Sequence, residues 1–190
     1  AVNASNYPFC TIEPNVGVVS VEDERLKRLA DVIKPERVVP ATIQFVDIAG
    51  LVEGASRGEG LGNEFLGHIR GVDAICHVVR CFQDNEVAHV REGLDPVSDL
   101  EIIETELLLA DLQLAERRLE RLERAKKSRD AAIMEEYSQL ERFVEGLSEG
   151  VPVREMVSSE EAVSLKGMGF LTSKPVIIVA NISEDDLTQH

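Results

Sequence analysis

A long helical stretch separates strand-forming stretches of this chain, and this order constrains the fold more than any other feature. Residues 100–147 contain no proline and a single glycine, whereas apolar, strand-like runs occur at 41–48, 73–82 and 176–180. Strand and helix patterns alternate before the helical stretch, and a further strand pattern follows it. Because this alternation is typical of α/β proteins, we predict one α/β sheet with a helical insertion.

Two apolar series inside the helical stretch step by four and three residues. They are Leu108, Leu112, Ala115, Leu119 and Leu122, and then Ile133, Tyr137, Leu140, Val144 and Leu147. Two such heptad series joined by a short charged break predict an antiparallel coiled-coil hairpin. The alternative is a pair of amphipathic helices packed on a globular core. Basic residues gather near the predicted tip, which is either solvated or in contact with an acidic partner: Arg117, Arg118, Arg121, Arg124, Lys126, Lys127 and Arg129.

Composition excludes several classes of protein. The formal net charge of −15 argues against broad, non-specific binding to a nucleic-acid backbone, although a local basic stripe remains compatible with it. Three cysteines form no zinc pattern, and Cys76 and Cys81 lie in an apolar run that favours small buried thiols. Residues 1–10 do not resemble a signal peptide, and no apolar run is long enough to span a bilayer. We expect a soluble, cytoplasmic protein without a membrane partner.

A glycine-rich segment follows the strand pattern at 41–48. Asp47 ends that strand, and Gly50 is the first of five glycines within residues 47–62. Ligands of α/β sheets bind outside the carboxyl ends of the strands. There an Asp can hold Mg²⁺ through water, and a glycine can offer its N–H group to a terminal phosphate. Such a short pattern also occurs in plain strand-to-helix turns, so this interpretation depends on other parts of the chain.

Two other parts of the chain support this interpretation. Thr11 lies in a loop bounded by prolines, where a switch threonine would complete a Mg²⁺ shell. The strand pattern at 176–180 ends on Asn181, followed by Ile182 and Glu184, where guanine-binding proteins carry Asn-Lys-x-Asp. The alternative is a simple helix-capping loop at this position. The order of all three parts favours a nucleotide hydrolase.

The segments NYPFCTIEPNVGVV, FVDIAGLVEGASRGEGLGNEFL, HVVRCF and NISE resemble the YchF subfamily of Obg-related P-loop proteins, and the resemblance extends over essentially the whole chain. It implies a Mg²⁺-dependent nucleotide hydrolase that prefers ATP to GTP, with K⁺ as a candidate second ion. It also implies a monomer that associates with ribosomes and contacts rRNA. We expect a nucleotide-hydrolase domain at 1–95, the coiled-coil insertion at 96–165, and the base-recognition strand and loop at 166–190.

The chain departs from this family in two respects. It contains no G-x-x-x-x-G-K-[ST] loop, which cradles the phosphates and which the family carries just upstream of the position matching Ala1. The C-terminal TGS domain of the family is also absent. We therefore expect the 190 residues to be the central part of a longer enzyme and the sheet to be incomplete.

Leu51 stands where many GTPases have a glutamine that orients the attacking water. Leucine cannot form a hydrogen bond with water, so a polar group elsewhere must orient the attacking water. The resemblance implies that His89 is the catalytic substitute; the alternative is an ordinary loop histidine. At the base, Glu184 and Ile182 replace the Asp and Lys that read guanine, which makes adenine admissible.

Two other functions stay open. One is a non-catalytic interaction module, which the absence of a phosphate loop from the parent gene would favour. The other is a GTPase with relaxed base specificity, which a titration of ATP against GTP would separate from an ATPase.

Overall fold

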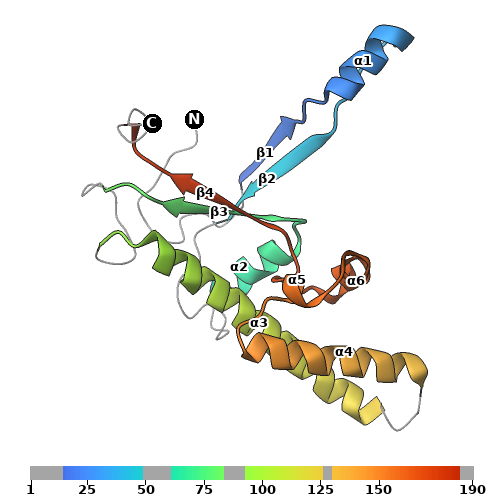
Figure 1. The fold of residues 1–190 in the computed structure, drawn as a ribbon, viewed down its shortest axis with the longest axis vertical. Helices are drawn as coiled ribbons and strands as arrows, with labels where there is room; N and C mark the ends of the chain where they lie inside the picture. Colours follow the sequence, from blue (N-terminus) through green and yellow to red (C-terminus); the bar gives the residue numbers. More distant parts are fainter. Residues whose placement is uncertain (1–14, 49–60, 84–92, 126–129, 185–190) are drawn as a thin grey trace. The chain divides into compact units, whose positions relative to one another are not determined.

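The computed structural model describes residues 15–48, 61–83, 93–125 and 130–184 (Figure 1). The chain divides into two compact units, residues 1–50 and residues 51–190. Each unit is described by itself below. Among the residues described, no helix is both long and apolar enough to cross a membrane.

The first unit is an antiparallel strand pair joined through a helix. Strand β1 (Asn15–Ser20) pairs with β2 (Thr42–Asp47), and α1 (Glu24–Ile33) lies between them in sequence. Asp23 caps α1 by accepting a hydrogen bond from the Arg25 N–H group at 2.8 Å. The helix ends where Lys34 adopts a left-handed conformation with φ 48°, directly before Pro35. The strand predicted at 41–48 is therefore confirmed as β2.

The second unit contains a parallel strand pair. Helix α2 (Leu61–Arg70) precedes β3 (Ile75–Arg80), which pairs in parallel with the distant β4 (Val176–Asn181). The prediction of one continuous sheet was wrong for the residues described, which form two separate two-stranded sheets. The reason is local pairing. Strands β1 and β2 pair with each other on either side of α1, while β3 and β4 pair with each other on either side of the helical crossover.

Strand β3 is less buried than its apolar sequence predicts. Its side chains alternate, so that Val79 is buried while Val78 is 59% exposed. Helix α3 contacts β3. Cys76 is exposed rather than buried as predicted, and Cys81 is half-buried; both are free thiols.

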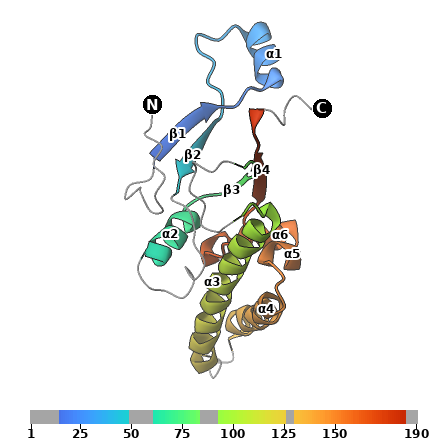
Figure 2. The ribbon, with the colours of Figure 1, turned by 90° about the vertical axis from the view of Figure 1, so that its left-hand side faces the viewer.

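The helical stretch forms two long helices. Helix α3 (Pro96–Ala125) and α4 (Ala131–Ser148) lie side by side and run antiparallel (Figures 1 and 2). Arg118 Nε donates to Glu136 Oε1 at 2.7 Å across the pair. Helix α4 ends in a Schellman motif, in which Gly150 adopts φ 83° and the Val151 N–H group donates to the Gly146 carbonyl at 2.8 Å. The helix pair and most of the predicted apolar contacts are observed; those in or against the core are Leu108, Leu112, Ala115, Leu119, Leu122, Leu140, Val144 and Leu147.

The core continues beyond the two helices. Short helices α5 (Val153–Met156) and α6 (Ser159–Leu165) and the 3₁₀ helix η3 (Lys166–Met168) follow α4. Val153, Leu165 and Phe170 join the same buried cluster, and the Phe143 and Phe170 rings meet edge to face at 5.4 Å. The base of the helix pair thus packs on a globular core, which was the alternative to a free coiled coil. Coiled-coil character and the domain boundaries at 95 and 165 stay predictions.

Candidate nucleotide site

The carboxyl ends of β3 and β4 lie at the same edge of the sheet because the two strands are parallel. Arg80 at the end of β3 is in register with Asn181 at the end of β4. The Cys81 N–H group extends the pairing by donating to the Asn181 carbonyl oxygen at 2.8 Å. The edge at which α/β proteins bind ligands therefore carries the predicted base-recognition segment.

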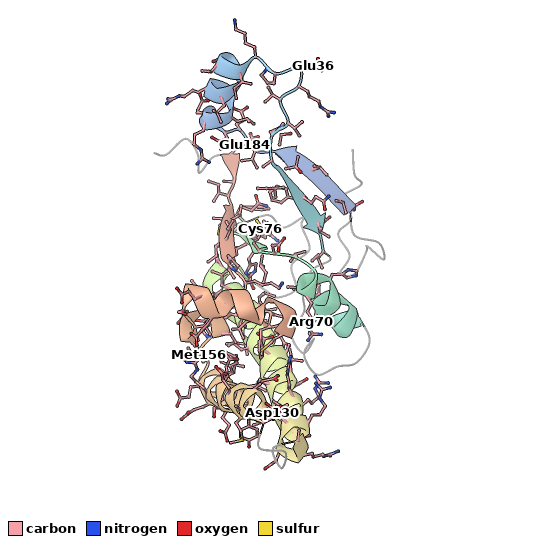
Figure 3. All side chains as sticks on the ribbon, turned by 90° about the vertical axis from the view of Figure 1, so that its right-hand side faces the viewer. Glu36, Arg70, Cys76, Asp130, Met156 and Glu184 are labelled. Atoms are coloured by element: carbon pink, nitrogen blue, oxygen red, sulfur yellow. The ribbon has the colours of Figure 1, made fainter. Side chains whose placement is uncertain are left out.

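The residues at and just after the end of β4 carry three kinds of side chain: an amide, a carboxylate and an aliphatic group. Asn181 supplies an amide that both donates and accepts hydrogen bonds, and Glu184 supplies an exposed carboxylate just beyond the strand (Figure 3). Ile182 is 40% exposed, which leaves aliphatic surface open beside them. An amide, a carboxylate and an apolar surface are the groups that a planar heterocyclic base needs for recognition. Strand β4 ends at Asn181, as predicted, and Ile182 and Glu184 follow it directly.

Arg80 and Phe82 belong to the same edge, and the sequence analysis missed them. The Arg80 Nε donates to the Phe82 carbonyl oxygen at 3.0 Å, and its guanidinium lies 4.8 Å from the centre of the Phe82 ring. Phe82 lies two residues beyond the end of β3, so the alternation of side chains along the strand does not predict this contact. Arg80 and Phe82 add a cation and an aromatic face next to Asn181.

Lys174 fixes the position of the chain just before β4. Its ammonium donates to the carbonyl oxygens of Arg70, at 3.2 Å, and of Val72, both at the end of α2. Burial lowers the pKa of Lys174, while the nearby carboxylates of Asp73 and Asp111 act in the opposite direction. The Ile75 N–H group then donates to the Pro175 carbonyl oxygen at 2.9 Å, which starts the pairing of the strands. The register that places Asn181 beside Arg80 is therefore set at the other end of β4.

Asp47 is the last residue of β2, as predicted, and its carboxylate is exposed. It lies in the first unit, whereas Asn181 lies in the second. An exposed carboxylate at a strand end fits Mg²⁺, which prefers hard oxygen ligands and keeps much of its water. In the part of the chain that the structure describes, no group of three or more His, Cys, Asp or Glu side chains gathers in a metal-binding arrangement. The other predicted site residues, Thr11, Gly50 and His89, lie outside the described residues.

The chain matches known proteins over most of its length. A family model described as a 50S ribosome-binding GTPase matches residues 1–182. The chain is 52% identical to the ribosome-binding ATPase YchF of Mycoplasma genitalium, over 98% of this chain and 51% of that protein. It is 48% identical to the same-named protein of Bacillus subtilis, over 97% of this chain and 50% of that protein.

A solved structure resembles the fold as well. The Schizosaccharomyces pombe YchF GTPase matches with a TM-score of 0.72 and 44% sequence identity, over 96% of this chain and 50% of that one. This match supports an α/β GTPase-like fold with a small sheet. The chain spans about half the length of the curated relatives it matches.

Proposed function

Because this chain belongs to the 50S ribosome-binding GTPase family, and to the YchF proteins within it, we propose that it forms part of a Mg²⁺-dependent nucleoside triphosphatase that acts at the ribosome. The observation that carries the proposal is the position of Asn181, Ile182 and Glu184 at the carboxyl end of a parallel strand. In α/β proteins this edge binds the ligand.

We assign the phosphate end of the nucleotide to the loops around Asp47. Thr11 and Asp47 are the proposed Mg²⁺ ligands, Asp47 through water, and a bound Mg²⁺ would neutralise charge on the phosphates. Gly50 offers its N–H group to the terminal phosphate. His89 orients the attacking water, since Leu51 lacks the polar group that would otherwise do so. A K⁺ ion is proposed as a further cation on the family resemblance alone.

We propose that the base is adenine in preference to guanine. The names of the relatives differ on this point, with ATPase in the bacterial names and GTPase in the fission yeast title. Guanine reading uses an Asp carboxylate and the stem of a Lys, and this chain has Glu184 and Ile182 at those positions. The extra methylene of Glu184 moves its carboxylate relative to the ring edge. The neighbouring Ile182 and Phe82 supply apolar surface that suits either purine.

The first prediction concerns this choice of base. Glu184→Asp together with Ile182→Lys, in the full-length protein, should raise GTP affinity relative to ATP, because the pair restores the carboxylate reach and the ring-covering stem. Binding titrations of both nucleotides with Mg²⁺ measure the ratio, and each single substitution serves as the control. An unchanged ratio in the double variant would place base selection in other groups.

We propose that the helix pair is a coiled-coil arm that contacts rRNA. The chain as a whole is acidic, with a formal charge of −15, whereas four arginines lie close together toward the end of α3. Arg118 is paired with Glu136, and the Arg117 Nε donates to the Gln113 carbonyl oxygen at 3.0 Å. Arg121 and Arg124 are exposed. A local basic surface of this kind suits phosphate contacts.

The remaining proposals follow from the same family membership. Residues 96–165 are the insertion that carries the arm, and residues 1–95 and 166–190 belong to the nucleotide-hydrolase domain. Since the bacterial relatives are named ribosome-binding proteins, we place this protein in the cytoplasm. We propose that it acts there as a monomer.

A further inference from the structure

A fully buried carboxylate joins α3 to the segment that leads into β4. The Asp111 side chain has no solvent exposure, and its Oδ1 accepts a hydrogen bond from the Leu171 N–H group at 2.8 Å. Its Oδ2 accepts from the Thr172 N–H group and from the Thr172 hydroxyl, both at 2.7 Å. A buried carboxylate is costly unless donors surround it. Burial raises the pKa of Asp111, and these three donors act in the opposite direction.

Thr172 extends the contact to α5. Its hydroxyl oxygen accepts a hydrogen bond from the Val153 N–H group at 3.1 Å, and its carbonyl oxygen accepts from the Arg154 N–H group at 3.1 Å. Thr172 is 1% exposed, so water does not compete for these bonds. We call the hydrogen-bonded set of Asp111, Leu171 and Thr172 the Asp111 clamp. It fixes two elements, α3 and α5, to one short segment, the chain before β4.

The segment after the clamp is held at two more points before β4 begins. Lys174 binds the carbonyl oxygens at the end of α2, and the Pro175 carbonyl oxygen accepts from Ile75 of β3. Strand β4 then runs in register with β3 as far as Asn181. The chain that links the Asp111 contacts to Asn181 contains no long stretch without such contacts. A displacement of Asp111 is therefore transmitted to Asn181, and the reverse.

We propose that the Asp111 clamp makes the helix pair α3–α4 and strand β4 one cooperative unit, so that the nucleotide end of β4 and the helical arm respond to each other. The link to nucleotide and ribosome rests on the proposed function; the cooperativity itself does not. Cooperative units of this kind open together, and a perturbation in one part lowers the protection of all parts. Asp111 is here a positioning residue, and its effect on the nucleotide acts through β4.

Native-state hydrogen exchange on the full-length protein tests the cooperativity without any ligand. Leu122→Ala loosens the helix pair near the end of α3, where Leu122 packs against the core. With the clamp intact, we expect the β4 amides from Ile177 to Ala180 to exchange roughly tenfold faster in this variant. In a Thr172→Val background, the same change should alter the β4 rates by about twofold or less.

Three further variants sharpen the test. Asp111→Asn should give the same loss of response as Thr172→Val, and Thr172→Val decides the matter if Asp111→Asn does not fold. Thr172→Ser keeps the hydroxyl and should preserve the response. Glu116→Gln, an exposed acid on the same helix, should change nothing. A β4 response of equal size in the unmodified protein and in both the Thr172→Val and Asp111→Asn backgrounds, or no response in the unmodified protein, would overturn the proposal.

Adding Mg·ATP tests the proposed nucleotide site separately from the Asp111 clamp. In the intact protein we expect protection of residues 181–184 and, with it, of the α3 amides near Asp111. In Thr172→Val the protection of 181–184 should remain while the α3 response is lost. Absence of protection at 181–184 would count against the nucleotide site, while the ligand-free comparison still decides the clamp. An α3 response that persists undiminished in Thr172→Val would contradict the clamp.

Discussion

His89→Ala in the full-length protein should slow ATP hydrolysis by about 10²-fold while leaving ATP affinity nearly unchanged. Leu51 cannot position water, so hydrolysis needs a polar group from another loop, and an imidazole with a pKa near neutrality suits that role. Because His89 would act on water rather than on the bound nucleotide, its loss should affect turnover and spare binding. Steady-state hydrolysis alongside a binding titration measures both quantities.

Two controls make the His89 result specific. Leu51→Ala should have a smaller effect, through packing of its loop. His68→Ala tests a second histidine, which lies in α2, and should leave turnover unchanged. If turnover of His89→Ala equals that of the unmodified protein, His89 has no part in the mechanism. Repeating the assay with ribosomes then shows whether the partner supplies the missing group.

Replacing Arg117, Arg121 and Arg124 together with glutamine should weaken binding to 50S ribosomal subunits strongly. If each arginine neutralises one phosphate, removing three reduces the slope of log affinity against log salt by about 2 to 3. The same relation gives a loss on the order of 10²-fold at about 0.1 M salt. Binding measured at several salt concentrations provides both the slope and the loss.

The matched control neutralises arginines in the first unit. Arg28 lies on α1 and Arg37 follows it, and both are exposed. Arg28→Gln with Arg37→Gln should leave the salt slope of ribosome binding unchanged. ATP affinity should stay the same in both sets of variants. An equal loss in the control would show that the overall charge, rather than the helical arm, determines binding.

Local patterns predicted the elements well because they depend on neighbours in sequence. Asp23, for example, directly precedes an apolar spacing typical of a helix, and it caps α1. The steps of four and three residues identified contacts that lie within or against the core, such as Ala115 and Leu140. Asp47 and Asn181 were each expected at the end of a strand, and each is the last residue of one.

Long-range contacts escaped prediction because nothing nearby in the sequence reveals them. Asp111 reads as a polar interruption in an apolar helix, and its partners Leu171 and Thr172 lie some 60 residues further along the chain. The exposure of Val78 depends on which elements cover the sheet, not on the strand itself. The contact between Arg80 and Phe82 depends on side-chain conformations that strand spacing alone does not determine. Geometry around Thr11, Gly50 and His89 lies outside the described residues, so their roles stay proposals.

The most direct test is the rate of ATP and GTP hydrolysis by the full-length protein with 50S subunits, with and without Mg²⁺. On the proposed roles of Asp47 at the phosphate end and of the Asn181–Glu184 segment at the base, we expect hydrolysis that requires Mg²⁺, with a higher kcat/KM for ATP than for GTP. Asp47→Asn should lower the Mg²⁺-dependent rate. No Mg²⁺-dependent hydrolysis of either nucleotide, or a clear preference for GTP, would contradict the proposed function.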